Sequence, residues 1–394
     1  MSPFKEKARL WKEGRKGFFR KYRDFNKKDR TIIWIHCASL GEFEQGRPVI
    51  EEIKKRDETI FILLTFFSPS GFEIRKDYPL ADLVCYLPAD SPSNTRRFIE
   101  LFKPDMAVFV KYEFWYNYLS CLKKNNIPLF LISANFRPDQ IFFRWYGSWF
   151  TRLLKYFTHI FVQSDISLSL LKSVGVNNAT VAGDTRFDRV YDIAQNSGEN
   201  QIARAFSSGN YTIVAGSTWP ADHDLLIRFV NETRHDIKLI IAPHEIHEKE
   251  IETLAARFSK EVIRYSHSSA SASDPAPAEI LIIDNIGILS SIYPYGKIAY
   301  IGGGFGKNIH NILEACTHGM PVIFGPKYSS FLEARELVDL GGAFPVESYD
   351  SLKKKAEELI EDKSLLRKAG MIAGNYVKSR IGATRFIVDK ILIS

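Results

Sequence analysis

The chain has 394 residues and a net charge of +7, with 45% hydrophobic and 25% charged residues. This length exceeds one ordinary core and predicts two domains, and the composition is that of a globular protein rather than a disordered or fibrous one. The four cysteines are scattered without a Cys-x-x-Cys pair, which argues against a zinc knuckle or a disulfide framework and fits a reducing compartment. The sequence shows no secretory signal and no apolar run of about 18 residues, so no segment is expected to span a bilayer.

The positive charge is concentrated at the N-terminus. Residues 1–30 hold twelve Lys or Arg and four Asp or Glu, so the rest of the chain is close to neutral. Apolar and aromatic residues lie between these charges, at Phe4, Leu10, Trp11, Phe18, Phe19 and Tyr22. Two interpretations stay open, a surface that docks on an anionic membrane and a solvated helix followed by a charged loop. Nucleic acid is not an expected partner, because no recognised nucleic-acid motif accompanies the segment.

The first half of the chain alternates between apolar runs and helical patterns. Strands are predicted at 32–40, 60–68, 106–110, 128–134 and 159–164. Helices follow the first of these strands, through Lys55, and the second, opening at Pro69. Strands separated by helices of this size indicate βαβ units and a parallel sheet.

A second series of strands begins after the polar stretch 195–210, which is the predicted interdomain linker. Its strands are predicted at 211–217, 237–243, 280–284, 297–303 and 321–325. The Ser/Ala/Pro-rich run 266–278 is expected to be an exposed mobile loop. Residues 351–392 are expected to be helical.

These patterns predict an α/β fold with two Rossmann-like domains that face a central cleft. The first domain is predicted over 1–200 and the second over 201–375, with a C-terminal helix over 376–394 that packs back on the first. Such sheets bind ligands at the carboxyl ends of their strands.

The strongest motif is a glycine-rich stretch at the end of a predicted strand. Gly302, Gly303 and Gly304 are followed by a helical pattern that includes Asn311 and Glu314. Glycines let the backbone approach a phosphate, a helix N-terminus supplies N–H donors, and Glu314 is placed to accept from two ribose hydroxyls. The glycine spacing excludes the dinucleotide fingerprint. A glycine turn that serves only packing is the alternative.

Polar residues also follow two strands of the first half. Ser39-Leu40-Gly41-Glu42 comes after the first strand, where a carboxylate can act as a general base, although acidic residues are common at helix N-termini for electrostatic reasons alone. Glu113 follows the strand at 106–110, and a core position does not explain a carboxylate there. The aromatic stretch 141–157 is open to two interpretations, lipid contact or packing within its own domain, and packing is favoured.

Two further strand ends in the second half offer polar groups. Ser217 and Thr218 present hydroxyls to a phosphate or an acid, and Pro243-His244 fits a base or a phosphate. His244, Glu245 and His247 raise the question of a metal, but no His-Glu-x-x-His motif and no third ligand are evident, so no metal is predicted.

In this order the motifs resemble the family of Kdo (3-deoxy-D-manno-octulosonic acid) transferases of lipopolysaccharide biosynthesis. The matching stretches are 36–42, 87–90, 113–117, 183–188, 215–218, 302–314 and 319–326. The resemblance implies a GT-B fold and an inverting transfer of Kdo from CMP-Kdo to a lipid A precursor. It also implies that no metal or other cofactor takes part, and that the protein works at the cytoplasmic face of the bacterial inner membrane. Family members usually begin with a hydrophobic anchor helix, so either that helix is missing here or the basic N-terminus docks the protein.

The resemblance also implies roles for individual residues. Glu42 matches the general base. On the donor side, the residues implied are Ser217, Thr218, Pro243, His244, Gly303, Gly304, Asn311 and Glu314. On the acceptor side, they are Ser39, Gly41, Arg47, Glu113 and Arg186. The chain departs from the family pattern at Lys111, Asn135 and Pro243-His244, the last of which stands where Pro-Arg-His is usual.

Two other functions remain alternatives to Kdo transfer. One is a different GT-B transferase or epimerase that uses a UDP-sugar. The other is a membrane-associated scaffold that has kept the fold and lost catalysis. The expected partners are CMP-Kdo, a lipid A precursor and an anionic membrane surface.

Overall fold

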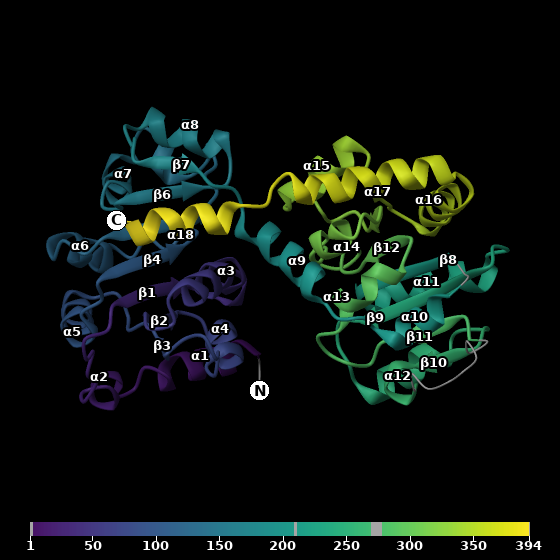
Figure 1. The fold of residues 1–394 in the computed structure, drawn as a ribbon, viewed down its shortest axis with the longest axis horizontal. Helices are drawn as coiled ribbons and strands as arrows, with labels where there is room; N and C mark the ends of the chain where they lie inside the picture. Colours follow the sequence, from purple (N-terminus) through teal and green to yellow (C-terminus); the bar gives the residue numbers. More distant parts are fainter. Residues whose placement is uncertain (1–2, 209–210, 269–277, 394) are drawn as a thin grey trace. The chain divides into compact units, whose positions relative to one another are not determined.

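The structure is a computed structural model that describes residues 3–208, 211–268 and 278–393. It shows two compact units, each built on a parallel seven-stranded sheet that helices cover (Figure 1). This confirms the predicted α/β architecture with two Rossmann-like halves. Most of the predicted loop 266–278 lies outside the described residues.

Unit 1 comprises the chain up to Arg189 and the stretch that begins at Arg380, whereas the sequence placed the start of this returning segment at residue 376. Its strands lie in the order β3-β2-β1-β4-β5-β6-β7. They are β1 (Ile32–Cys37), β2 (Phe61–Phe66), β3 (Leu83–Tyr86), β4 (Met106–Val110), β5 (Leu129–Ala134), β6 (His159–Val162) and β7 (Ala179–Val181). The chain moves outward from β1 to β3 and then returns to the other side of β1 with β4. The carboxyl ends of β1 and β4 therefore form the switch point at which such sheets bind ligands.

Unit 2 comprises Val190–Ser379, and its strands lie in the order β10-β11-β9-β8-β12-β13-β14. They are β8 (Tyr211–Thr218), β9 (Ile237–Pro243), β10 (Val262–Arg264), β11 (Ile280–Ile282), β12 (Ile298–Ile301), β13 (Val322–Phe324) and β14 (Ala343–Pro345). Strand β8 lies between β9 and β12, so the switch point of this sheet is at the carboxyl ends of β8 and β12.

The helices follow the strands as the βαβ pattern predicts. In unit 1 they are α1 (Pro3–Glu13), α2 (Phe18–Lys21), α3 (Leu40–Arg56), α4 (Pro69–Arg75), α5 (Pro92–Phe102), α6 (Tyr116–Lys124), α7 (Ser148–Leu154), α8 (Asp165–Ser173) and α18 (Ala383–Ile393). Helix α9 (Thr185–Asn196) crosses from unit 1 to unit 2. In unit 2 they are α10 (Gln201–Ser207), α11 (Pro220–Glu232), α12 (Glu248–Ala255), α13 (Leu289–Ile292), α14 (Leu313–Thr317), α15 (Leu332–Leu340), α16 (Tyr349–Glu361) and α17 (Lys363–Lys378). No helix in the described part of the chain is both long and apolar enough to cross a bilayer.

The central strand β1 of unit 1 is buried on both faces. Ile32 and Trp34 join an apolar cluster with residues of α5 and α6, whereas Ile33 and Ile35 join a second cluster with residues of α3 and α18. Ile387 of α18 is fully buried in that second cluster. The C-terminal helix is therefore part of the core of unit 1.

Four strands were not predicted from the sequence, and these are the edge strands of the two sheets, β3, β7, β10 and β14. Each has three or four residues, and most of their side chains are only half-buried. A short, half-exposed strand lacks the continuous apolar run by which a strand buried on both faces is identified.

The division between the units falls after Arg189, inside α9, rather than in the predicted linker 195–210. Arg189 forms an ion pair of 3.2 Å with Glu44 of α3, which holds the first half of α9 on unit 1. Part of the polar stretch forms α10 instead. The N–H of its N-cap, Asn200, donates a hydrogen bond to the Tyr295 hydroxyl, so this helix is fixed in unit 2.

Candidate functional site

One candidate site lies at the carboxyl ends of β1 and β4 in unit 1. Ser39 is the N-cap of α3, and Glu42 lies in the first turn of that helix. The Ser39 hydroxyl donates a hydrogen bond to the Glu42 carboxylate, and its side chain does not cap a backbone N–H of the helix. Glu42 is half-buried, while the neighbouring Gly41 is exposed. A carboxylate held in one orientation at a strand end is suited to accept a proton from a bound hydroxyl group.

Glu113, which follows β4, lies beside two ring nitrogens, one of which donates a hydrogen bond to it. Trp115 Nε1 donates a hydrogen bond of 2.7 Å to Glu113 Oε2, and His36 Nε2 lies 3.3 Å from the same oxygen. His36 is fully buried, and its Nδ1 lies 2.8 Å from the Thr65 hydroxyl. When Thr65 donates to Nδ1, the ring proton of His36 is on Nε2. This buried nitrogen lies near Glu113 but makes no hydrogen bond of regular geometry with it. Oε1 of Glu113 forms no hydrogen bond with the described residues, so Glu113 keeps one oxygen for a ligand.

The carboxylates of this site also act on the buried Cys37. Burial raises the pKa of the Cys37 thiol well above its usual value, and the negative charges of Glu42 and Glu113 raise it further. A thiol that stays protonated is a poor nucleophile. The site therefore offers carboxylate chemistry rather than cysteine chemistry.

The two arginines predicted on the acceptor side already have carboxylate partners. Arg47 Nε lies 2.6 Å from Glu51, one turn further along α3. Arg186 Nη2 lies 2.7 Å from Asp184, next to the start of α9. A guanidinium in such an ion pair has to exchange its partner before it can bind a substrate anion.

A second candidate site lies at the carboxyl ends of β8, β9 and β12 in unit 2. Ser217 has a positive φ of 53° at a bulge in β8, a conformation that L residues rarely adopt. Thr218 is buried, and its hydroxyl lies 3.0 Å from His223 Nε2. The Ser217 side chain forms no hydrogen bond with the described residues. Of the two predicted hydroxyls, Ser217 is therefore the one left for a ligand.

Three aromatic side chains, one from each of these strand ends, stack on one another. His244 lies between Trp219 and His310, with ring-centroid distances of 4.6 and 4.3 Å. Trp219 Nε1 donates a hydrogen bond of 2.9 Å to His310 Nε2. Since an indole N–H can only donate, this Nε2 carries no proton. Burial, and after it the neighbouring His244, lowers the pKa of His310, which favours the same neutral form.

Asp222 connects this stack to the glycine-rich loop. It is buried, and its Oδ2 accepts hydrogen bonds of 2.9 Å from the backbone N–H groups of Trp219 and Gly303. Its Oδ1 accepts a hydrogen bond of 2.7 Å from the Tyr300 hydroxyl. Asp222 was not among the residues predicted from the sequence. The available signal was a helix start with Pro220 in the first position and an acidic residue two positions later.

Packing requires the glycines of this loop. A Cβ on Gly302 would lie 2.3 Å from the backbone oxygen of Ser217, and one on Gly304 would lie 2.6 Å from Gly325 Cα. Gly303 has a φ of 92°, and its N–H donates a hydrogen bond to the buried Asp222 carboxylate. These contacts favour the packing alternative that the sequence left open. The N–H of Gly303 is not available to a phosphate.

The helix predicted to follow the glycines begins later, at Leu313. Asn311 Oδ1 accepts a hydrogen bond of 3.1 Å from the N–H of Leu313, and Asn311 Nδ2 donates one of 3.2 Å to Glu314. The predicted pair Asn311 and Glu314 is therefore brought together, and Asn311 orients the carboxylate at the start of α14.

A hollow of about 280 Å³ lies between α11 and α12, at the ends of β8 and β9. Trp219, Pro243 and Arg257 are among the residues that line it. Thr218 and Pro243 are the two predicted donor-side residues that border this hollow.

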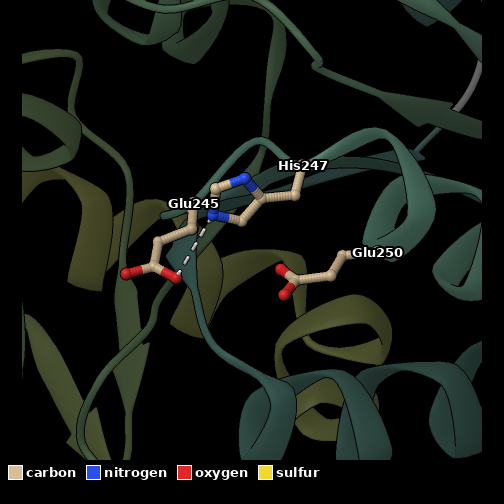
Figure 2. Close-up of side chains that lie close together, drawn as sticks. All are labelled: Glu245, His247 and Glu250. Carbon is tan, nitrogen blue, oxygen red and sulfur yellow. Dashed lines mark ion pairs between the residues drawn. The ribbon is translucent and has the colours of Figure 1, made fainter. Parts of the chain in front are cut away.

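Figure 2 shows three side chains that could hold a metal ion, Glu245, His247 and Glu250. Their ligand atoms lie within 4.8 Å of one another, and all three residues are exposed. Glu250 is the third group that the sequence analysis did not find. His244, which was considered with them, stacks between two rings instead.

Comparison with known proteins relates the chain to one family. Residues 11–189 match the family model described as 3-Deoxy-D-manno-octulosonic-acid transferase (kdotransferase). The chain is 29% identical over 363 residues to the 3-deoxy-D-manno-octulosonic acid transferase of Aquifex aeolicus, which covers 89% of this chain and 93% of that protein. It is 25% identical over 376 residues to the transferase of the same name from Bordetella pertussis, with 91% and 86% covered. These matches confirm the predicted resemblance. The family model covers most of unit 1, and the two relatives match through both units.

Solved structures confirm the GT-B fold. The UDP-GlcNAc 2-epimerase from Neisseria meningitidis, bound to UDP-GlcNAc, has a TM-score of 0.61 at 17% identity and covers 92% of this chain and 100% of that one. A glycosyltransferase from Rickettsia africae has a TM-score of 0.58 at 14% identity, with 92% and 97% covered. At such low identity the likeness concerns the fold alone.

Proposed function

The chain is a relative of the Kdo transferases along most of its length, and from this we propose that it transfers Kdo from CMP-Kdo to a lipid A precursor. The observation that carries the proposal is the sequence match through both units. It is supported by a carboxylate, Glu42, at the switch point of unit 1. The relatives support glycosyltransferase activity, and the donor, the acceptor and the stereochemistry are the parts that we propose.

In the proposed step, Glu42 takes the proton of an acceptor hydroxyl. The oxygen of that hydroxyl forms a bond to the anomeric carbon of Kdo. The bond between this carbon and the phosphate oxygen of CMP breaks, its electrons stay on the phosphate, and CMP leaves. Attack from the face opposite to CMP inverts the configuration, by analogy with inverting glycosidases.

Unit 2 is the proposed donor side. Glu314, held by Asn311, is placed to accept from the ribose hydroxyls. The unbonded hydroxyl of Ser217 is available to the phosphate or to the Kdo carboxylate, and the stack around His244 offers a flat surface to a base. No metal or other cofactor takes part in the proposed step.

The test is a transfer assay with radiolabelled CMP-Kdo, lipid precursor and the full chain. UDP-sugars are tried as donors in parallel. Glu42→Gln should abolish most of the transfer, whereas Glu100→Gln, an exposed carboxylate of α5, should leave it unchanged. Transfer from a UDP-sugar and not from CMP-Kdo would identify the other GT-B activity. No turnover with any donor, and cells indifferent to Glu42→Gln, would identify a scaffold.

We also propose that unit 1 docks on an anionic membrane surface at the cytoplasmic face of the inner membrane. Trp145 is 93% exposed, Tyr146 58% and Trp149 48%, next to Arg144 and Arg152. Exposed indole and phenol rings beside cationic groups favour the interface between lipid and water.

A row of aromatic rings extends this surface along the carboxyl edge of the unit 1 sheet. The Phe67 ring, after β2, packs on Trp11 of α1 and on Trp115, after β4, with ring-centroid distances of 5.8 and 4.7 Å. Tyr116, the next residue, contacts Trp149 of α7 at 5.3 Å. The docking surface and Glu42 therefore belong to the same edge of one sheet.

Other aromatic residues of these segments serve the core. Phe18 and Phe142 are buried, and Phe142 packs on Phe114 at 4.7 Å. The two interpretations of 141–157 thus apply to different residues, and Phe142 is no candidate for lipid contact. The side chains of residues 1–5, including Phe4, lie outside the described part of the chain.

Flotation with anionic vesicles tests the docking. Binding should be strong at low salt and fall steeply by about 0.5 M salt. The Debye length shortens from about 10 Å at 0.1 M salt to about 3 Å at 1 M, so added salt screens the attraction between the basic residues and the anionic lipid. Trp145→Ser with Trp149→Ser should reduce the fraction that remains bound at high salt. Ile286→Ser, which removes a 90% exposed apolar side chain from unit 2, is the matched control and should have no effect. Equal binding of both variants would contradict the docking surface.

A further inference from the structure

A large basic hollow lies in unit 1, and none of its lining residues has a role in the proposed transfer. It has a volume of about 970 Å³ and is bordered by α1, α2, the loop after β3 and the start of α5, elements that Figure 1 shows together. Six cationic side chains line it, and Glu13 is the one carboxylate in its lining. The cations are Arg9, Lys12, Arg15, Lys16, Arg20 and Arg97.

Arg15 connects the hollow to the carboxyl edge of the sheet. Its guanidinium donates hydrogen bonds of 2.7 Å to the carbonyl of Leu87, after β3, and of 2.7 Å to that of Phe67, after β2. It also lies 4.2 Å from the Trp11 ring centroid and 4.9 Å from that of Tyr86. Burial lowers the pKa of Arg15 to about 10, because no carboxylate in the described part of the chain compensates its charge. Arg15 therefore supports the hollow structurally.

The other five cations also have no ion-pair partner among the described residues. The neighbouring segment is different, since Lys27 pairs with Asp105 at 2.6 Å and Arg30 with Asp82 at 3.2 Å. Arg97 is fixed over the Phe19 ring at 4.0 Å, which keeps its charge beside the hollow. Uncompensated positive charge on several sides of one cavity repels itself, and a bound anion relieves that repulsion.

We propose that this hollow binds a phosphate group. Lys and Arg side chains supply the charge-assisted hydrogen bonds that phosphate oxygens accept. The rings of Trp11 and Phe19 beside them suit the apolar part of a phospholipid, and a free phosphate offers the same anionic chemistry without it. No lining residue of the hollow takes part in the proposed transfer chemistry, and binding to the hollow can be measured without turnover.

Isothermal titration calorimetry of the full chain tests the proposal with two probes. One is inorganic phosphate and the other is a short-chain phosphatidylglycerol below its micelle concentration. The triple variant Lys12→Ser, Lys16→Ser, Arg20→Ser removes three exposed charges of the hollow. The control removes the same charge elsewhere in unit 1, from exposed lysines without an ion-pair partner among the described residues: Lys55→Ser, Lys123→Ser, Lys124→Ser.

The proposal expects at least one probe to bind with one-to-one stoichiometry, about tenfold or more weaker in the triple variant and unchanged in the control. Binding of the lipid alone assigns the site to a headgroup, and competition by phosphate assigns it to the phosphate group by itself. Absence of binding by both probes, or equal loss in the triple variant and the control, overturns the proposal. A kcat that stays the same in the triple variant separates this site from Kdo transfer.

Discussion

Asp222→Ala should be among the most destabilising single changes in unit 2. The buried carboxylate accepts hydrogen bonds from the N–H groups of Trp219 and Gly303 and from the Tyr300 hydroxyl. Alanine leaves three donors without this acceptor, and each buried unsatisfied group costs about 1–3 kcal/mol. Because water can enter the space and accept some of these hydrogen bonds, we expect the free energy of unfolding to fall by about 3–6 kcal/mol. Asp222→Asn keeps one oxygen to accept from the two N–H groups and turns its amide toward Tyr300, whose hydroxyl can then accept instead of donate. We therefore expect this variant to lose only about 1–2 kcal/mol of the free energy of unfolding.

Urea unfolding of the full chain, followed by circular dichroism, gives these free energies. Hydrogen exchange then locates the effect. The Gly303 amide should exchange faster in Asp222→Ala, while the amides of β1 in unit 1, which do not depend on this carboxylate, should keep their rates. A cost below about 1 kcal/mol for Asp222→Ala, or an unchanged rate at Gly303, would refute the reasoning.

The remaining predictions concern activity, nucleotide binding, metal and pH. Glu42→Gln should lower kcat by about 100-fold or more and leave CMP affinity intact, and near-normal turnover would remove Glu42 from its role. Glu314→Ala should weaken CMP binding by about 1–3 kcal/mol in calorimetry, and unchanged affinity would mean that the carboxylate does not reach the nucleotide. Transfer should survive EDTA and His247→Ala, whereas loss in both would make the exposed cluster of Figure 2 a required metal site. The pKa of His310 is lowered in the folded protein, so its contribution to stability is present above its ordinary value of 6.5 and is lost as pH falls from there toward the folded pKa. Thermal unfolding from pH 7.5 to 5 should show this loss, and His310→Gln, which still offers an oxygen to the indole N–H, should reduce it; identical pH profiles for the two proteins would contradict the assignment.

The sequence predicted the inner strands because each of them is buried on both faces. The run 106–110 is the clearest case, since its predicted bounds are those of β4. Edge strands such as β7 carry side chains that are all half-buried, so no local pattern separates them from loops. The polar stretch 195–210 was predicted to be a linker because of its composition, yet it contains α10. Phe206 and Ala203 are enough to bury one face of α10, although the composition around them is that of a linker.

The positions of candidate residues were predictable, and their partners were not. Strand ends are visible in the sequence, and ligands bind at strand ends, so Glu42 and Ser217 could be selected. The contact between Asp222 and Gly303 joins residues 81 positions apart. It depends on β8 and β12 being neighbours, and only the order of strands in the sheet reveals that.

The partners of the two carboxylates at the switch point of unit 1 bear on the proposal that Glu42, rather than Glu113, takes the proton. Glu42 is bonded to the Ser39 hydroxyl, which can donate to a carboxylate and accept from a carboxylic acid. When Glu42 takes a proton, this hydrogen bond can reverse and persist. Glu113 is bonded to the indole N–H of Trp115, which can only donate, so a proton on that oxygen would set two donors against each other. The hydrogen bonding therefore keeps Oε2 of Glu113 as a fixed acceptor, and the reversible bond to Ser39 supports the proposal that Glu42 takes the proton.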